Sequence, residues 1–414
     1  MVPNGWEVKK LEDLCAPDAP ITYGVLKPGE YCSNGIPLLQ IKDLSNGHVS
    51  SQDLHLISKE LDEEYKRSRI LKNDILISLV GTIGRVAKFE LSSPANIHRN
   101  LGRVRTDYHE FIFHFLNSDV ALKLMGDSSS GSSQSALNLS TLRAMKVPFP
   151  PFKEQQKIAQ ILSTWDQAIS ATEKLLENSQ QQKKALMQQL LTGKKRLLDE
   201  NGERFSGDWN KVSIASTFKL ITDYVASGSF ATLKENVVVS EQVGFAHYVR
   251  QTDLAANFKN STLKWVDEES YNFLKKSNLY QGDILFTNIG DLGKVYYMPA
   301  LDKPATVAPN LVVLRVNTTN DSKFIYYLLA SEVGQREVNK IKSGTGLPKI
   351  SKTEFKTMLF NIPPFEEQKR IAAIISTADS EIEVLNRKLD CLKQEKKALM
   401  QQLLTGKKRV KVAA

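Results

Sequence analysis

Two short glycine-containing loops carry residues that could bind a nucleic acid or a phosphate group. They read Gly81-Thr-Ile-Gly84-Arg85 and Gly290-Asp-Leu-Gly293-Lys294, and each follows a strand-like stretch at an offset of 209 residues. Glycines let the backbone approach a ligand closely, and an arginine or lysine suits a phosphate group or a guanine edge. An ordinary β-turn with a solvated cation gives the same pattern, but its recurrence favours a shared role.

Groups for enzymatic catalysis are much harder to find. The chain lacks the motifs GxxxxGK[ST], HExxH and GxSxG. The stretch from Asn361 to Phe365 departs at Ile362 from the Asn-Pro-Pro-aromatic motif of adenine methyltransferases, and no glycine-rich cofactor loop precedes it, so we interpret it as a helix start. We expect no catalytic residue in this chain.

Histidines and cysteines give no metal-binding pattern either. The histidines show no partner arrangement that repeats along the chain, and they are His48, His55, His98, His109, His114 and His247. Cys15, Cys32 and Cys391 are odd in number and have no CxxC spacing, which argues against a disulfide framework or a structural zinc site. We expect no metal site.

Length and charge narrow the class of protein further. A chain of 414 residues exceeds one ordinary core, so we expect two to three domains. It contains no apolar run that could span a membrane and no signal-peptide pattern at the start, so we expect a cytoplasmic protein. Eight of the nine net positive charges lie in segments 150–197 and 363–414. The nearly neutral remainder could bind DNA only through local clusters and base-edge contacts.

An internal repeat sets the architecture. Residues 150–196 align without a gap on residues 363–409 at an offset of 213, and 28 of the 47 positions are identical, including the last 14. Each copy begins with Pro-Pro-Phe and ends near Gly193 or Gly406, where glycine can adopt a left-handed helix cap. The chain is therefore a tandem duplication in which a variable block precedes each helix of about 40 residues.

Apolar residues with alternating four-three spacing predict that the two helices pair. The positions are Ile158, Leu162, Trp165, Ile169, Thr172, Leu176, Ser179, Lys183, Leu186 and Leu190 in the first helix, and Ile371, Ile375, Ala378, Ile382, Leu385, Leu389, Leu392, Lys396, Leu399 and Leu403 in the second. This pattern is typical of a coiled-coil seam, and equal lengths favour antiparallel pairing with pseudo-twofold symmetry over two helices each lying on its own domain. We expect the seam lysines, Lys183 and Lys396, to set the register.

The two variable blocks have a mixed pattern. Segments 36–41, 74–80, 283–289 and 310–316 are predicted strands, and segments 110–125 and 324–341 have helical periodicity. We expect compact α/β blocks, each with a twisted sheet and one or two helices, in an α+β fold overall. The serine- and glycine-rich stretches 128–135 and 343–346 are either flexible linkers or loops that become ordered on a ligand.

These features together resemble the DNA-specificity subunits of type I restriction–modification enzymes. The resemblance covers essentially the whole chain. It rests on the two variable blocks, on the Pro-Pro-hydrophobic-x-Glu-Gln-x-x-Ile-Ala signature at 150–159 and 363–372, on the Leu-Leu-Thr-Gly-Lys-Lys helix ends, and on the openings at Trp6 and Trp209. It implies a target-recognition domain at 1–149, a central helix at 150–197, a second target-recognition domain at 198–362 and a C-terminal helix at 363–410.

The resemblance also implies the partners and the division of labour. Each block would read one half of an asymmetric, split DNA sequence. The helices would dock two methyltransferase subunits, which carry S-adenosylmethionine, and two restriction subunits could add ATP-driven cleavage. The chain itself would bind no cofactor and catalyse nothing. Alternatives are a specificity subunit that serves a fused restriction–methylation polypeptide, and a coiled-coil scaffold unrelated to DNA.

No family motif fixes the residues that contact DNA, so we choose polar side chains that can offer paired donors or acceptors to base edges. In the first block these are Tyr23, Gln40, Lys42, Thr82, Arg85, Asn100 and Gln134. In the second block they are Arg250, Thr252, Asn288, Lys294, Asn310, Thr345 and Lys349. Most of them could equally be turn-formers or solvated polar groups, and we expect about a third to touch DNA.

Overall fold

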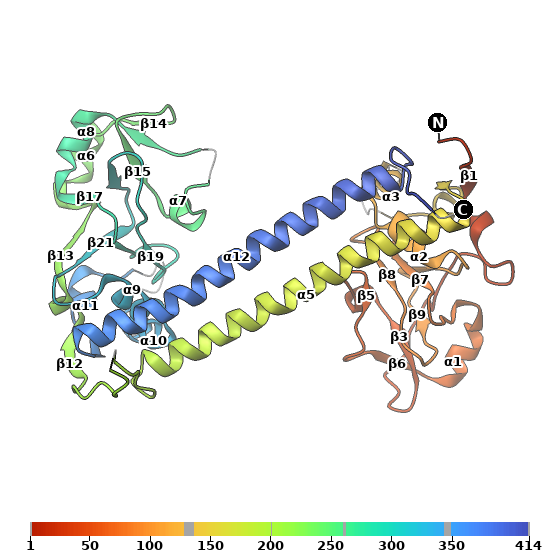
Figure 1. Cartoon of the computed structure of the whole chain (residues 1–414), viewed down its shortest axis with the longest axis horizontal. Coiled ribbons are helices and arrows are strands. Elements are labelled where there is room, and N and C mark those ends of the chain that lie inside the picture. The colour runs from red at the N-terminus through yellow and green to blue at the C-terminus, as the bar shows by residue number, and fades with distance from the viewer. Residues whose placement is uncertain (1, 128–135, 200, 260–261, 343–348, 413–414) are drawn as a thin grey trace. The chain divides into compact units, whose positions relative to one another are not determined.

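The computed structural model describes residues 2–127, 136–199, 201–259, 262–342 and 349–412. It forms two compact units, Met1–Lys174 with Asn386–Ala414 and Leu175–Leu385. Each unit contains one variable block and part of both long helices (Figure 1). Residues 1–149 are called the first block below, and residues 198–362 the second block.

The first block is built on small sheets with short helices packed against them. Its strands are β1 (Glu7–Lys10), β2 (Thr22–Tyr23), β3 (Ile36–Leu39), β4 (Leu44–Ser45), β5 (His48–Val49), β6 (His55–Ile57), β7 (Ile75–Ser78), β8 (Val86–Lys88), β9 (Asn96–Ile97), β10 (Leu101–Val104) and β11 (Lys146–Phe149). Its helices are α1 (Lys59–Glu64), α2 (His109–Leu116), α3 (Asp119–Asp127) and α4 (Leu139–Arg143). The strand orders are β2-β10-β7-β8-β5-β4, β6-β3-β9 and β1-β11.

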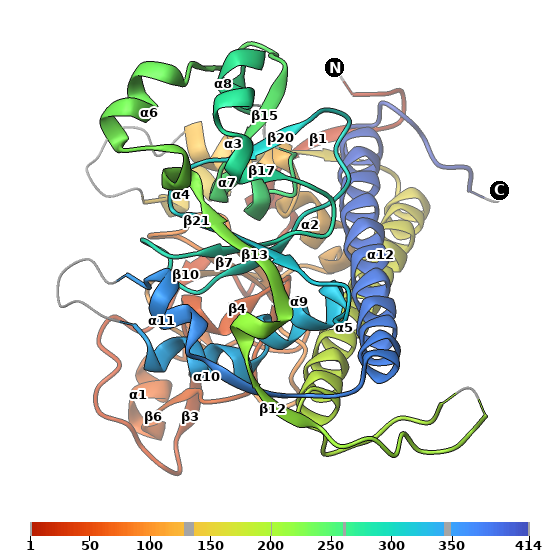
Figure 2. The same cartoon turned by 90° about the vertical axis from the view of Figure 1, so that its left-hand side faces the viewer.

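The second block repeats this plan, with a short helix and a short strand added at residues 230–240. Its strands are β12 (Asn210–Ser213), β13 (Phe218–Asp223), β14 (Val239–Ser240), β15 (Ala246–Val249), β16 (Trp265–Val266), β17 (Asn278–Leu279), β18 (Ile284–Thr287), β19 (Val295–Tyr297), β20 (Ala305–Val307), β21 (Leu311–Val316) and β22 (Leu359–Ile362). Its helices are α6 (Phe230–Asn236), α7 (Gln251–Ala255), α8 (Glu268–Phe273), α9 (Ser322–Ala330), α10 (Glu332–Lys340) and α11 (Lys352–Lys356). The strand orders are β13-β21-β18-β19, β14-β16-β15-β20-β17 and β12-β22, and α6 lies beside α8 (Figure 2).

Three expectations about the blocks need correction. One or two helices were expected in each, but the described residues contain four in the first block, α1–α4, and six in the second, α6–α11. Each block has more than one sheet, because β3 and β15 pair in a second sheet and not beside β7 and β18. The predicted helical stretches 110–125 and 324–341 are each broken into two helices, at Ser118 and Ser331. The Ser118 Oγ donates to the Phe115 carbonyl at 2.6 Å, and the Ser331 Oγ donates to the Leu328 carbonyl at 2.7 Å. Each serine therefore ends one helix and begins the next. Apolar periodicity cannot predict such a break, because the break arises from a hydrogen bond between a side chain and the nearby backbone.

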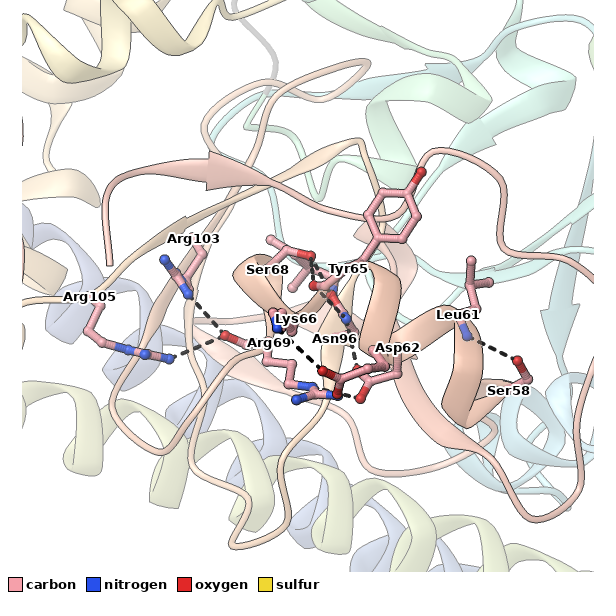
Figure 3. A network of polar contacts seen from close by, with 12 residues as sticks. Ser58, Leu61, Asp62, Tyr65, Lys66, Ser68, Arg69, Asn96, Arg103 and Arg105 are labelled. Carbon is pink, nitrogen blue, oxygen red and sulfur yellow. Dashed lines mark hydrogen bonds and ion pairs between the residues drawn. The ribbon is translucent and has the colours of Figure 1, made fainter. Parts of the chain in front are cut away.

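A buried polar network links α1, β9 and β10 of the first block (Figure 3). The Asn96 amide donates to Asp62 at 2.9 Å and accepts from the Ser68 hydroxyl at 2.7 Å, while the Arg69 Nε donates to the other Asp62 oxygen at 2.7 Å. Arg103 donates to the carbonyl oxygen of Arg69 at 3.1 Å. Most of these polar groups satisfy one another, although the buried Arg103 Nε has no hydrogen-bond partner among the described residues, so this network mainly supports the sheet.

The two long helices, α5 (Phe152–Leu190) and α12 (Phe365–Leu403), pack against each other, as predicted (Figure 1). Every predicted seam position is buried or half-buried, whereas Leu175 and Val384, off the seam, are 53% and 54% exposed. The pairing is antiparallel within each unit. In the first unit Glu173 pairs with Lys393 at 2.8 Å and Asp166 pairs with Lys396, so partner numbers rise on α12 as they fall on α5.

The seam lysines occupy equivalent polar contacts in the two units. Lys396 forms an ion pair with Asp166 of α5, and Lys183 forms an ion pair with Asp379 of α12. Asp166 and Asp379 are related by the repeat offset of 213, as are the two lysines. A lysine placed in an apolar seam is stabilised only where its carboxylate partner lies opposite, so these pairs favour a single antiparallel register.

In each unit the glutamate of the Glu-Gln signature lies at the centre of a buried polar cluster. In the second unit the carboxylate of Glu367 accepts from Arg196 at 2.7 and 2.8 Å and from the Trp209 indole at 3.2 Å. In the first unit Glu154 accepts from the Trp6 indole at 3.2 Å and pairs with Arg409, and both glutamates are nearly fully buried. Each cluster therefore ties the start of a block to the start of one helix and to the segment after the other helix.

Candidate nucleic-acid interface

The two glycine-containing loops occupy equivalent hairpin positions in the two units. One connects β7 to β8 and the other connects β18 to β19. Gly81 and Gly290, at the tips, have φ angles of 75° and 83°, in the left-handed region that favours glycine. A Cβ atom at either tip would meet none of the described residues within 4 Å, so that part of the chain leaves the tips uncovered.

The second glycine of each loop rests on a helix of its own unit. A Cβ atom on Gly84 would lie 2.8 Å from the Leu122 side chain of α3, and one on Gly293 would lie 2.7 Å from Val338 of α10. Gln335 of α10 also donates to the Gly293 carbonyl at 2.8 Å. Each loop is therefore packed at its base and exposed at its tip, as a preorganised binding loop requires.

A buried hydroxyl braces each loop from inside. The Arg85 backbone N–H donates to the Ser78 Oγ at 2.8 Å, and the Ser78 hydroxyl donates to the Thr82 carbonyl. In the second block the Lys294 backbone N–H donates to the Thr287 Oγ1 at 2.9 Å, and the Thr287 hydroxyl donates to the Asp291 carbonyl at 2.6 Å. The hydrogen-bond pattern is the same although the side chains differ.

Two further segments meet the first-block loop at the end of β7. The Leu79 N–H donates to the Asn100 carbonyl at 2.8 Å, and the Leu79 carbonyl accepts from the Leu137 N–H at 2.7 Å. The predicted residues Thr82, Arg85 and Asn100 therefore lie on neighbouring segments at one place.

The second block repeats this meeting of segments. The Asn288 N–H donates to the Asn310 carbonyl at 3.2 Å, and the Asn288 carbonyl accepts from the Ile350 N–H at 3.1 Å. Lys349 forms a β-bridge with Ile289. The structure thus brings together Asn288, Asn310 and Lys349, and the Asn288 Oδ1 is a buried acceptor with no hydrogen-bond partner among the described residues.

A turn after β3 adds Gln40 and Lys42 to the first cluster. The Gln40 N–H donates to Asp43 at 2.7 Å, which fixes the turn, and the Arg85 guanidinium donates to the Ile41 and Leu44 carbonyls at 3.3 Å each. The Lys42 side chain is exposed. These contacts place the turn against the loop that carries Arg85.

In the second block the equivalent turn, after β15, carries Arg250, and this guanidinium bonds to other groups of the same block. The Arg250 guanidinium donates to Asp253 at 3.0 and 2.7 Å and to the Thr262 carbonyl at 2.7 Å. Hydrogen bonding to Asp253 raises the pKa of Arg250 above its ordinary value. Most donors of this guanidinium are therefore engaged within the block, while Thr252, on the same turn, is exposed.

The two loops differ in charge. Arg85 forms no ion pair within 4.0 Å in the part of the chain that the structure describes. Lys294 pairs with Asp291, which stands where the first block has Thr82, and this partner raises the pKa of Lys294. The first loop therefore presents a cation and the second a cation beside a carboxylate, so the two loops offer a ligand different charges and hydrogen-bonding groups.

Of the other predicted residues, Tyr23 lies on β2, an edge strand beside β10, and its side chain is 37% exposed. Gln134 and Thr345 lie outside the described residues. Ser78, Thr287 and Asp291 also take part in these loops, although they were not among the predicted residues. The alignment at offset 209 already placed Asp291 opposite Thr82 and Thr287 opposite Ser78, and that correspondence was the available signal.

Other kinds of site receive little support. Over the described ranges no group of three or more histidine, cysteine, aspartate or glutamate side chains could hold a metal ion. Within the same ranges no helix is both long and apolar enough to cross a bilayer.

Comparison with known proteins identifies the family. Residues 3–179 and 207–394 match the family described as type I restriction modification DNA specificity domain. The putative type I restriction enzyme MjaX specificity subunit of Methanocaldococcus jannaschii is 26% identical over 429 residues, covering 99% of this chain and 95% of that subunit. The EcoBI specificity subunit of Escherichia coli is 32% identical over 195 residues, covering 46% of this chain and 41% of that subunit.

Solved structures share the fold. The S subunit of a type I restriction–modification system from M. genitalium superposes with a TM-score of 0.56 at 16% identity, covering 98% of both chains. A chain in a structure of a type I R-M system gives the same TM-score at 16% identity, covering 98% of this chain and 99% of that one. The chain belongs to the type I restriction–modification specificity-subunit family. This membership favours a DNA-specificity subunit over a coiled-coil scaffold unrelated to DNA.

Proposed function

We propose that this chain selects the DNA target of a type I restriction–modification complex by reading a split, asymmetric sequence, one half with each block. The observation that carries the proposal is the pair of equivalent loop clusters, built on the same hydrogen bonds but bearing different side chains. Equivalent scaffolds suit equivalent tasks, and different side chains at the tips suit different bases.

The chain itself performs no catalysis in this proposal. Two methyltransferase subunits dock on α5 and α12, carry S-adenosylmethionine and methylate adenine in the two half-sites. Restriction subunits that use ATP join the same complex where they are present. The chain binds none of these cofactors, and the complex works in the cytoplasm. Its partners also supply part of the phosphate neutralisation, since both blocks are nearly neutral.

The helix pair fixes the spacing between the half-sites in this proposal. The helix α5 is uninterrupted from Phe152 to Leu190, and α12 has the same length of 39 residues. A stiff helical connection converts protein length into base-pair spacing, so only one gap length should be accepted.

Reconstitution with a methyltransferase partner tests this function. The purified chain alone should transfer no methyl group from S-adenosylmethionine to DNA. The chain with the methyltransferase should methylate adenines at one split sequence, and the partner without the chain should lose that sequence preference. Methyl transfer by the chain alone would contradict the proposal.

Replacing Arg85 with alanine should weaken recognition through the first block only. If the guanidinium reads a guanine edge, discrimination at one base pair of that half-site should fall by about 1–3 kcal/mol, with the second half-site unaffected. Competition binding of the reconstituted complex to duplexes substituted one base pair at a time measures this effect. An equal loss on every duplex, with a smaller salt dependence, would assign Arg85 to a phosphate instead.

A further inference from the structure

The buried hydroxyls of Ser78 and Thr287 make contacts that plain hairpins do not need. Both residues end a central strand, and both are 0% exposed. Each hydroxyl accepts from the backbone N–H seven residues later, at Arg85 or Lys294, and donates to the backbone carbonyl four residues later, at Thr82 or Asp291. One oxygen therefore joins both sides of each loop.

These hydrogen bonds act on particular residues of the loop. The carbonyl that accepts belongs to the residue directly after the exposed tip glycine, which is Thr82 in one block and Asp291 in the other. Both of these residues are exposed. Holding a residue by its own carbonyl fixes its backbone, and hence the direction of its side chain, without using the side chain itself.

The same hydrogen bond forms in both blocks although both of its residues differ in type. Serine holds threonine in the first block, and threonine holds aspartate in the second. The loop backbone is therefore kept constant while the outward side chain changes. The exposed residue of each loop therefore offers a different hydrogen-bonding group from the same backbone position.

We propose that residues 82 and 291 are base-reading positions of the first and second block, and that Ser78 and Thr287 are positioning residues that hold them in place. This inference rests on the proposed function. The Thr82 hydroxyl both donates and accepts, whereas the Asp291 carboxylate only accepts. In the major groove Asp291 therefore selects an exocyclic amino group, that of cytosine or adenine, and excludes the acceptor edge of guanine.

Neighbouring side chains hold the Asp291 carboxylate for this task. Lys294 pairs with it, and the Gln251 amide donates to it at 3.4 Å. The carboxylate is still about half exposed. Its remaining acceptor positions are available to a base.

The test uses the full chain assembled with its methyltransferase and duplexes randomised in one half-site at a time. Thr287→Val removes the hydroxyl at nearly constant shape, and Thr287→Ser keeps it. The valine variant should lose roughly tenfold discrimination at one base pair of the second half-site, the size expected when backbone groups lose a buried partner. The serine variant should retain wild-type discrimination, and both variants should read the first half-site normally.

Two more variants separate positioning from general stability. Asp291→Asn, which lets the side chain donate as well as accept, should change the preferred base at the same base pair. Ser78→Ala should reduce base discrimination at the first half-site and leave discrimination at the second half-site unchanged. Unchanged base preference in Thr287→Val and Asp291→Asn, even with lower thermal stability, would overturn the inference. A wild-type complex without any split-site preference would overturn the proposed function as well, which distinguishes the two failures.

Discussion

Replacing Glu367 with alanine should destabilise the second unit by about 3–5 kcal/mol. The Glu367 carboxylate is 1% exposed and accepts two hydrogen bonds from Arg196 and one from Trp209. Removing it leaves a partly buried guanidinium and an indole N–H without their acceptor, which is the costly way to break a buried ion pair. Amide hydrogen exchange, followed separately for the two units, measures the loss.

Two comparisons make this result specific. Glu366→Ala, one residue earlier, removes an exposed carboxylate whose ion pair with Lys369 is also exposed, so it should change stability by less than about 0.5 kcal/mol. Glu154→Ala should destabilise the first unit, but by less than Glu367→Ala does the second, because Arg409 is more exposed than Arg196. If Glu366→Ala cost as much as Glu367→Ala, the buried cluster would not be what closes the unit.

Acid should destabilise the first unit through His114. This side chain is 1% exposed, its Nε2 lies 3.0 Å from the Ser163 hydroxyl, and its Nδ1 lies 3.7 Å from Asp166 of α5. Burial is the main cause that lowers the pKa of His114 to about 4; Asp166 opposes the shift, and Lys396 of α12 adds to it. Since Lys396 already neutralises Asp166, a second cation there is poorly stabilised.

The direction of the effect follows from proton linkage. In the unfolded chain the pKa of this histidine returns to its ordinary value near 6.5, so below that pH the unfolded state binds a proton that the folded state refuses. The stabilising effect of a neutral His114 is present above about pH 6.5 and is lost as the pH falls towards 4. At about 1.4 kcal/mol per pH unit, the loss reaches ~3 kcal/mol. Glu110 and Lys88 also face this histidine and modify the midpoint.

The repeat supplies the matched control. In the second unit Tyr327 stands at the equivalent position, and its hydroxyl donates to Asp379 at 2.7 Å and lies 3.1 Å from Ser376. His114→Tyr should therefore remove the acid sensitivity of the first unit, and Tyr327→His should create it in the second. Hydrogen exchange between pH 4 and 7.5 measures both. Equal pH dependence in wild type and His114→Tyr would show that other carboxyl groups cause the acid loss.

The repeated helices could be predicted almost completely from the sequence. Their ends, their length and their seam all follow from local signals: the Pro-Pro start, the glycine cap and the four-three spacing. The partners of the two repeated glutamates could not be predicted. Glu154 and Arg409 are 255 residues apart, and only the three-dimensional pairing of α5 with α12 brings them together.

Within the blocks the sequence predicted the strands better than their arrangement. The expected strands at 36–41, 74–80, 283–289 and 310–316 contain β3, β7, β18 and β21. Their division between separate sheets depends on long-range pairing that alternation of residue types does not encode. Choosing polar side chains that can offer donors or acceptors to base edges likewise included Arg250, and only the structure shows that most donors of this guanidinium are engaged within the block.

The central claim is that the two blocks read the two halves of one split sequence. Mapping methylated adenines in cells that contain the methyltransferase partner, with and without this chain, tests it most directly. We expect a single motif made of two half-sites with a constant gap, present only with the chain and altered in its second half alone by Asp291→Asn. A continuous motif, or one that persists without the chain, would contradict the claim.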